Sequence, residues 1–224
     1  MREVRVMFRK TGKAKYISHL DLTRCFSRAI TRAKITLWYT EGYNPRPYMT
    51  FSMPLTLGVE GMAEAMDLRI EGDMTDEEIY SRLAPVMPPD ITVYQVAPPV
   101  HKMADIQYSR YEFLVEQHQL SPEELMSSFQ NSAADPDIYI EKLGKKGREK
   151  VMKQIPIHEH TREFSVEALE DGIVRMEVLL TSNNAFGINP KLFIDKYLEV
   201  AGVEPEYLAM KRLGLYTASG DPFC

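Results

Sequence analysis

Apolar and polar residues alternate over residues 3–9, which places Val4, Val6 and Phe8 on one face of a predicted strand. Ser18 then begins a predicted helix as its N-cap, and apolar residues follow at helical spacing from Leu22. Similar patterns continue through the first part of the chain. The predicted elements there are a strand (3–9), a helix (from 18), two strands (51–59 and 66–70), a helix (75–83) and a strand (91–96).

This β-α-β-β-α-β order is that of a ferredoxin-like module. The proline-rich piece 98–103 is typical of a linker, and the same order can be traced again, more loosely, beyond it. The sequence therefore predicts an α+β fold of tandem ferredoxin-like (βαββαβ) modules, residues 1–98 and 104–224, with a single larger α+β domain as the alternative. The second set comprises strands (108–117, 138–143, 161–169, 173–180), helices starting at Ser121 and Asn189, and a tail (206–216) that suits either a strand or a helix.

The charges are unevenly divided along this otherwise ordinary composition of 44% hydrophobic and 26% charged residues. Residues 1–60 carry 11 Lys and Arg residues against 4 acidic ones, a net charge of +7, so the remainder of the chain carries −12. Such a division favours one end that faces a polyanion and another that is solvated or faces a partner. The alternative is a chance clustering of charges on solvated faces.

The first predicted helix has arginines four residues apart, at Arg24, Arg28 and Arg32, which form one ridge on its polar face. Like charges at this spacing repel one another, so the ridge has little value for stability. Arginine presents a planar fork suited to phosphates and bases, and Lys13 and Lys15 lie nearby in the sequence. The ridge is therefore a candidate RNA-binding surface, and a solvated surface ridge is the alternative.

Two further segments have the composition of RNA-binding loops. Residues 37–48 crowd aromatic residues, prolines and an arginine together, which is typical of a site for unpaired bases. For Trp38 a place in a buried strand is favoured over a binding role. Residues 142–153 hold six basic residues and two glycines, so they suit either a phosphate-grasping loop or a hairpin tip. The candidate RNA-binding residues in these segments are Tyr43, Arg46, Tyr48, Lys145, Lys146 and Arg148.

Few residues suggest chemistry. His19 at a helix start is a candidate base, with Tyr16 beside it, although a histidine there is more often a capping or packing residue. The sequence has no C-x₃-C-x₂-C run, zinc-binding spacing, GxxxxGK[ST] or GxGxxG, so we expect no cofactor and no metal. A start without a signal-peptide pattern, the lack of a long apolar run and two distant cysteines predict a cytoplasmic protein with free thiols.

The motifs between residues 15 and 70 resemble those of the radical-SAM-associated family of domains of unknown function. The matching segments are Lys15 to Leu22 with Arg24, Tyr39 to Asn44 with Pro45 and Pro47, Phe51 to Glu60, and Met66-Asp67. The chain departs from the family pattern at Arg46, where a histidine or a similar residue is expected. The resemblance implies a role beside a radical SAM protein with a cobalamin-type domain, in the processing of ribosomes or other RNA.

Three functions remain open from the sequence. The first is an RNA-binding accessory protein that presents tRNA or rRNA to a radical SAM partner and is not itself catalytic. The second is a metal-independent endoribonuclease that uses His19 and Tyr16, by fold-level analogy with CRISPR RNA-processing enzymes. The third is a protein-docking partner whose acidic remainder binds another protein.

Overall fold

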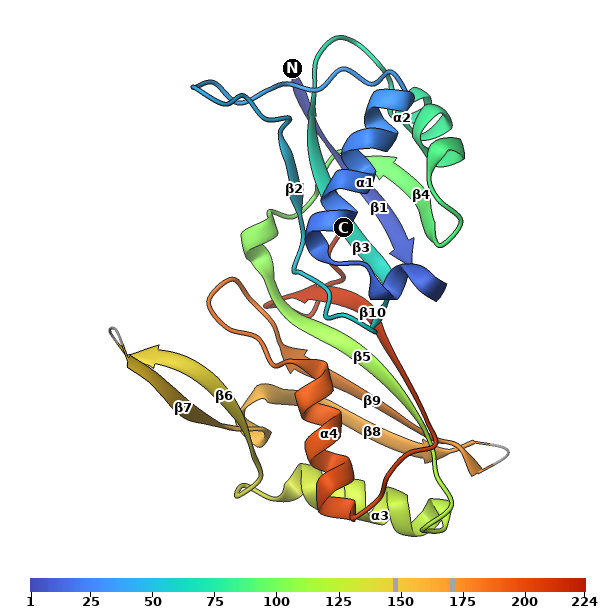
Figure 1. Ribbon diagram of the computed structural model, residues 1–224, viewed down its shortest axis with the longest axis vertical. Helices are drawn as coiled ribbons and strands as arrows, with labels where there is room; N and C mark the ends of the chain where they lie inside the picture. Colours follow the sequence, from blue (N-terminus) through green and yellow to red (C-terminus); the bar gives the residue numbers. More distant parts are fainter. Residues whose placement is uncertain (147–148, 170–171) are drawn as a thin grey trace. The chain divides into compact units, whose positions relative to one another are not determined.

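The computed structural model describes residues 1–146, 149–169 and 172–224 (Figure 1). The chain forms two compact units of mixed α+β architecture. Unit 1 comprises residues 1–107 and 212–224, and unit 2 comprises residues 108–211. The predicted modules, 1–98 and 104–224, differ from these units chiefly at the C-terminal end, because residues 212–224 pack within unit 1.

Unit 1 follows the predicted β-α-β-β-α-β order. Its strands lie in the order β4-β1-β3, with β2 paired to β3, and each of these pairs is antiparallel. The last strand, β10 (Tyr207–Thr217), is next to β3 in the sheet order. The other elements are β1 (Arg2–Lys10), η1 (Gly12–Tyr16), α1 (His19–Arg32), β2 (Met49–Phe51), β3 (Glu60–Ile70), α2 (Asp76–Leu83), η2 (Ala84–Val86), β4 (Ile91–Ala97) and η3 (Met103–Asp105).

Local signals in the sequence set the helices of unit 1. The Ser18 side chain accepts a hydrogen bond from the Asp21 amide, which confirms the predicted N-cap of α1. Thr75 and Glu78 form a capping box at the start of α2, where the helix 75–83 was predicted to begin. The apolar face of α1, which includes Phe26, then packs on Val6 and its even-numbered neighbours in β1.

The opposite face of the sheet holds a buried ion pair between neighbouring strands. Arg5 in β1 is paired in register with Asp67 in β3, and its Nε and Nη2 donate to the two carboxylate oxygens at 2.7 and 2.8 Å. Arg5 also donates to the main-chain oxygens of Cys224, at 2.6 Å, and His101, at 2.8 Å. The Phe223 ring lies 4.1 Å from its guanidinium carbon. A single arginine thus joins two strands, the 98–105 segment and the C-terminal segment.

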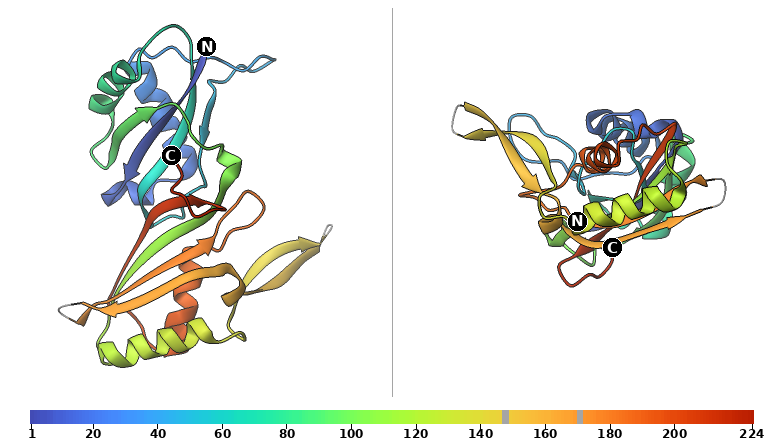
Figure 2. Two further views of the ribbon diagram at one scale, coloured as in Figure 1. Left: turned by 180° about the vertical axis from the view of Figure 1, so that it is seen from behind. Right: turned by 90° about the horizontal axis from the view of Figure 1, so that it is seen from below.

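An apolar cluster surrounds this ion pair and explains why the C-terminal segment belongs to unit 1. Met7 and Ala65 project from β1 and β3 to meet Ile106, Leu215 and Phe223, all of which are buried. Figure 2 (left) views unit 1 from this face of the sheet, opposite the helices. Residues 212–224 therefore cover apolar surface that would otherwise be exposed on the sheet.

A second buried arginine strengthens the same attachment. The Arg212 guanidinium donates to both oxygens of Glu64, including an Nε bond of 2.9 Å, and to the main-chain oxygen of Met53 at 2.7 Å. Lys10 is also buried near this pair. Burial lowers the pKa of Lys10, whereas the charge of Glu64 raises it and that of Arg212 lowers it further. Both buried arginines of unit 1 are therefore matched by a carboxylate, as burial of a charge demands.

Unit 2 has the strand order β10-β5-β9-β8, with β5–β9 and β8–β9 antiparallel. Two helices pack on it around buried Phe113, Phe129 and Tyr197. A separate two-stranded sheet, β6-β7, is inserted between the first helix and β8. The elements are β5 (Ile106–Glu116), α3 (Pro122–Ala134), β6 (Tyr139–Lys146), β7 (Glu149–Pro156), η4 (His158–His160), β8 (Thr161–Ala168), β9 (Val174–Thr181) and α4 (Pro190–Ala201).

Three sequence predictions need correction or completion. The predicted strand 51–59 is wrong beyond Phe51, because Pro54 lacks an amide donor and the chain takes a positive φ at Gly58 before β3 begins. The basic segment 142–153, predicted as a loop or a hairpin tip, lies largely within the β6-β7 hairpin. The tail that suited either a strand or a helix is the strand β10. None of the described helices is long and apolar enough to cross a membrane.

Two ion pairs of the β1–β3 ladder, one buried and one exposed, are expected to differ greatly in their contribution to the free energy of unfolding. Asp67→Ala leaves the Arg5 charge buried without its carboxylate, so we expect the free energy of unfolding to fall by about 3–5 kcal/mol in urea titration. Glu3→Ala breaks the exposed Glu3–Arg69 pair of the same ladder and is expected to cost less than about 1 kcal/mol. Equal losses in the two variants would show that burial does not govern the strength of these pairs.

Candidate nucleic-acid interface

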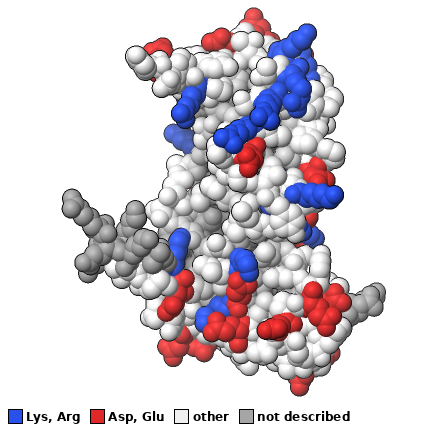
Figure 3. Space-filling model, in the orientation of Figure 1, with Lys and Arg blue, Asp and Glu red and all other residues white. Residues whose placement is uncertain are grey.

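The structure brings the three predicted arginines of α1 to one groove. Arg24, Arg28 and Arg32 are exposed and face the segment Val86–Pro88, which follows α2, across a hollow of about 390 Å³. The Arg32 Nη2 donates to the main-chain oxygen of Val86 at 2.9 Å, which fixes the far end of the ridge. In Figure 3 the Lys and Arg side chains of unit 1 form a band along α1. This arginine groove is lined by three arginines and one acidic residue, Asp21.

The surroundings of the arginine groove leave most of its charge available. Asp21 lies at one end, with its Oδ1 3.4 Å from Arg24 Nη1. A hydrogen bond from the Ser18 hydroxyl, together with Arg24, lowers the pKa of Asp21, so it remains a carboxylate. Among the described residues Arg28 forms no ion pair, so its guanidinium is open to a ligand. In the groove, therefore, a carboxylate balances the Arg24 guanidinium, a neutral carbonyl holds that of Arg32, and no described acidic group pairs with that of Arg28.

Cys25 contributes its thiol to the groove wall. Burial raises the pKa of this thiol, against the opposing effect of the Arg32 and Arg28 charges. The thiol is therefore neutral at ordinary pH and is poorly suited to act as a nucleophile. The arrangement favours binding of an anion over thiol chemistry.

The lysines predicted near the ridge lie outside the groove. Both belong to the short helix η1, which precedes α1. The amide of Lys13 donates to Asp90 Oδ2 at 2.9 Å, and its side chain is exposed. Lys15 Nζ lies 4.0 Å from Glu60 Oε1 and 5.4 Å from the Tyr16 ring centroid. Lys15 is thus partly neutralised within unit 1, whereas Lys13 extends the positive surface beyond the helix start.

The candidate catalytic residues are not assembled into an acid–base pair. His19 is the first residue of α1 and is exposed, and its ring meets the edge of Phe51 at a centroid distance of 5.3 Å. Tyr16 is 67% exposed. Within the part of the chain that the structure describes, no hydrogen bond links His19 to Tyr16, and no group of three or more metal-ligating side chains is present.

The aromatic loop after α1 divides into a packed base and an exposed tip. At the base, the Arg69 guanidinium carbon from β3 lies 4.0 Å from the Tyr48 ring centroid and 5.3 Å from that of Trp38. Glu3 holds Arg69 from the other side, through an Arg69 Nε bond of 2.8 Å. Tyr48 therefore has a structural contact that its sequence position did not reveal, and the half-buried Trp38 packs beside it rather than inside the core.

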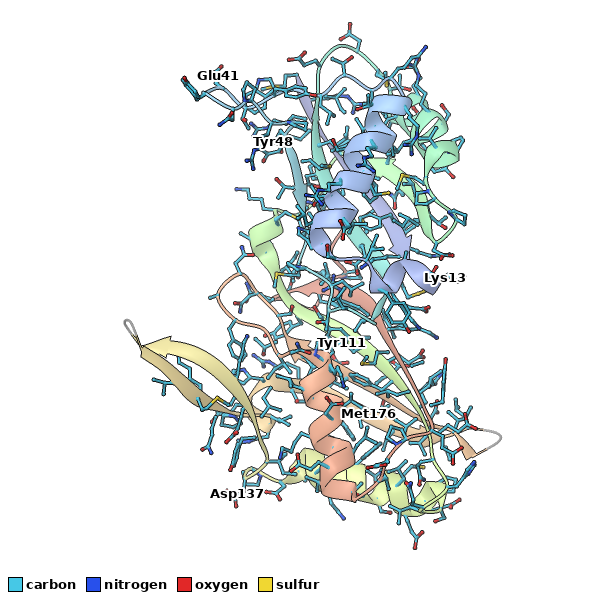
Figure 4. All side chains as sticks on the ribbon, in the orientation of Figure 1. Lys13, Glu41, Tyr48, Tyr111, Asp137 and Met176 are labelled. Atoms are coloured by element: carbon cyan, nitrogen blue, oxygen red, sulfur yellow. The ribbon has the colours of Figure 1, made fainter. Side chains whose placement is uncertain are left out.

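The tip of this loop is open to solvent. The Thr40 amide donates to the Arg46 carbonyl at 2.8 Å and the Arg46 amide to Thr40 Oγ1 at 3.1 Å, which closes the turn. Tyr43 is fully exposed, and the Arg46 side chain is exposed as well. In Figure 4 the labelled Glu41 marks this tip, which extends away from α1. The tip residues are thus available for stacking but do not line the arginine groove.

The remaining predicted RNA-binding residues fall in the β6-β7 hairpin. Lys145 and Lys146 lie in β6, and Arg148 lies outside the described residues. Neither Arg69 nor the wall at Val86–Pro88 was expected from the sequence. The i,i+4 spacing revealed the ridge, but the groove wall comes from a segment more than fifty residues away, and no local pattern indicates it.

Truncating a ring at the packed base is expected to cost much more stability than truncating one at the exposed tip. Tyr48→Ala removes the cation–π contact with Arg69, so we expect the free energy of unfolding to fall by about 1–2 kcal/mol. Tyr43→Ala removes a ring that contacts little, and the change should stay within about 0.5 kcal/mol. Thermal melts monitored by circular dichroism of the two variants would test this, and a larger loss for Tyr43→Ala would make the tip a structural element.

Comparisons with known proteins give the fold and the family. A chain in a structure titled "Crystal Structure of a Cbf5-Nop10-Gar1 Complex" is similar over 92% of this chain and 47% of that chain, with a TM-score of 0.50 and 10% sequence identity. At this identity the likeness shows a shared fold alone, and this chain spans about half the length of that one. No curated protein matches the chain. Residues 3–190 match the model of a bacterial family, and the chain therefore belongs to the family described as "Uncharacterized protein conserved in bacteria (DUF2344)".

Proposed function

We propose that this protein binds RNA in the arginine groove of unit 1 and is not itself catalytic. The observation that carries the proposal is the convergence of Arg24, Arg28 and Arg32 on one concave surface with a single carboxylate at its end. Guanidiniums four residues apart on a helix are separated by about 6 Å along the axis, so the ridge is about 12 Å long. An extended run of this length suits the phosphates of a chain better than one small anion.

Other features of unit 1 support RNA as the polyanion. The exposed Tyr43 and Arg46 offer a ring and a planar cation on which unpaired bases can stack. Residues 1–60 carry a net charge of +7, which draws a polyanion toward this part of the chain. The aromatic tip adds a stacking surface to the electrostatic attraction of unit 1, which favours RNA with unpaired segments.

The proposed role is that of an accessory protein, which presents tRNA or rRNA to a radical SAM partner with a cobalamin-type domain. The support for this partner is the resemblance of the motifs between residues 15 and 70 to the radical-SAM-associated family. The sequence has no C-x₃-C-x₂-C run that could hold the iron–sulfur cluster of such an enzyme, so radical chemistry would have to come from the partner.

We also infer that the two units are tandem ferredoxin-like modules. In unit 1 the order β4-β1-β3-β2 is supported by antiparallel pairing throughout. In unit 2 the order β10-β5-β9-β8 is equivalent once the β6-β7 hairpin is treated as an insertion. Each unit then has two helices that connect strands in the βαββαβ sequence.

Reversing one charge in the arginine groove is the direct test of RNA binding. Arg28→Glu should weaken binding to a mixture of tRNA and rRNA fragments by at least about tenfold and reduce the slope of log affinity against log salt by about 1. Filter binding across a salt series measures both quantities. Lys102→Glu makes the same charge change at an exposed residue of unit 1 outside the groove and serves as the control. Binding that is indifferent to Arg28→Glu would refute the proposed site.

An RNA-cleavage assay without metal ions tests the proposal that the protein is not itself catalytic. Labelled RNA incubated with the purified protein in EDTA is expected to stay intact, because His19 and Tyr16 are not joined as an acid–base pair. Gel analysis of the RNA over several hours provides the measurement. Cleavage that disappears in the His19→Ala variant would instead establish the metal-independent endoribonuclease. Cleavage that persists in that variant would point to a contaminant nuclease.

A further inference from the structure

The basic residues of unit 2 are concentrated on the β6-β7 hairpin. Residues 139–156 carry six Lys and Arg residues against two acidic ones, whereas the rest of unit 2 carries six against sixteen. Acidic side chains are correspondingly frequent on the face of unit 2 that Figure 3 presents. The hairpin, here called the basic hairpin, is thus a local positive element on a unit whose other residues carry a net negative charge.

The register of the basic hairpin places like charges opposite one another. Lys142 is the cross-strand partner of Lys153. Like charges directly opposite on two strands are destabilising, and a two-stranded sheet has little stability of its own. Neither Lys142 nor Lys153 forms an ion pair among the described residues, and both side chains are exposed. Repulsion between these two lysines costs stability, and no carboxylate among the described residues balances it. The pair therefore suits an anion from outside the protein.

The base of the hairpin is anchored, so its distal part has a fixed point of attachment. Ile140 and Ile155 are cross-strand partners and are both buried. The ladder continues toward the body through a hydrogen bond of 3.0 Å from the Ile157 amide to the Ile138 carbonyl. The residues next to this base line a hollow against α4 that includes Leu192. The pair Lys142–Lys153 lies two ladder positions beyond the anchored isoleucines.

We propose that the basic hairpin is a second RNA-binding element, which holds the phosphate backbone through the cross-strand pair Lys142 and Lys153 without reading base sequence. Lysine contributes a point charge on a flexible stem, which suits phosphates in variable positions. An anion between Lys142 and Lys153 removes the repulsion between them, so binding and hairpin stability are linked. The inference rests on the proposed function, since a polyanion that fills the arginine groove is the same kind of ligand that the hairpin would take.

Charge reversal at one strand separates a structural role from a binding role. Lys153→Glu replaces a repulsive Lys–Lys pair with an attractive Lys–Glu pair. We therefore expect the melting temperature of the full chain to stay the same or to rise, while RNA affinity falls by about tenfold and the salt slope by about 1. Lys191→Glu, on α4 of the same unit, makes the same change of net charge and should leave RNA affinity within about twofold of the wild type.

Parallel titrations of the wild type, Arg28→Glu, Lys153→Glu and Lys191→Glu with the same RNA distinguish the failures. If the wild type does not bind RNA, the proposed function and this inference fall together. If Arg28→Glu weakens binding but Lys153→Glu binds as the wild type does, the inference alone is overturned. Equal losses in Lys153→Glu and Lys191→Glu would show a net-charge effect and also overturn it. Polyglutamate tests the alternative partner, an acidic protein. That partner would replace RNA at the hairpin if polyglutamate displaces RNA from the wild type and binds Lys153→Glu more weakly, while Lys153→Glu keeps full RNA affinity.

Discussion

The ion pair between Arg5 and Asp67 is the interaction on which unit 1 depends. It lies between two central strands on the sheet face that the helices leave open, and it also binds the main-chain oxygens of His101 and Cys224. A buried guanidinium needs a full set of acceptors, and these acceptors come from three distant segments. Arg212 repeats the arrangement with Glu64. The two arginines together attach the C-terminal segment to the sheet that carries α1.

Arginines have different roles on the two sides of the sheet in unit 1: some are buried in ion pairs and others are exposed on α1. Arg5 and Arg212 are buried and fully matched by carboxylates, whereas Arg24, Arg28 and Arg32 project from the outer side of α1. Arg69 has a third role, as a platform for the Tyr48 and Trp38 rings. The amphipathic pattern of α1 alone explains why its arginines are exposed, because its apolar stripe is used by the core. Because Arg5 is buried against Asp67, it adds nothing to the positive charge that a ligand of residues 1–60 would meet.

The charge division of the chain is also redistributed by folding. Residues 1–60 are basic and the remainder is acidic, yet the basic hairpin lies within the acidic part. Its sequence suited a flexible loop because the two glycines and the run of lysines disfavour regular structure. Pairing of two eight-residue strands, with buried isoleucines at the base, overrides that preference. The groove in unit 1 and the hairpin in unit 2 are therefore separate positive surfaces, each created by packing.

The sequence by itself determined the features whose causes lie within a few residues. The caps at Ser18, Thr75 and Ser121, the end of α4 at Gly202 with its positive φ, the α+β class and the arginine ridge could all be predicted from local pattern. The tertiary structure alone decided the partner of Arg5, 62 residues away, that of Arg212, 148 residues away, the wall of the groove and the platform under Tyr48. Hydrogen bonds of a cap act across three residues, so sequence spacing encodes them. Contacts between distant segments depend on which strands pair and which faces are buried, and no spacing along the chain records that choice.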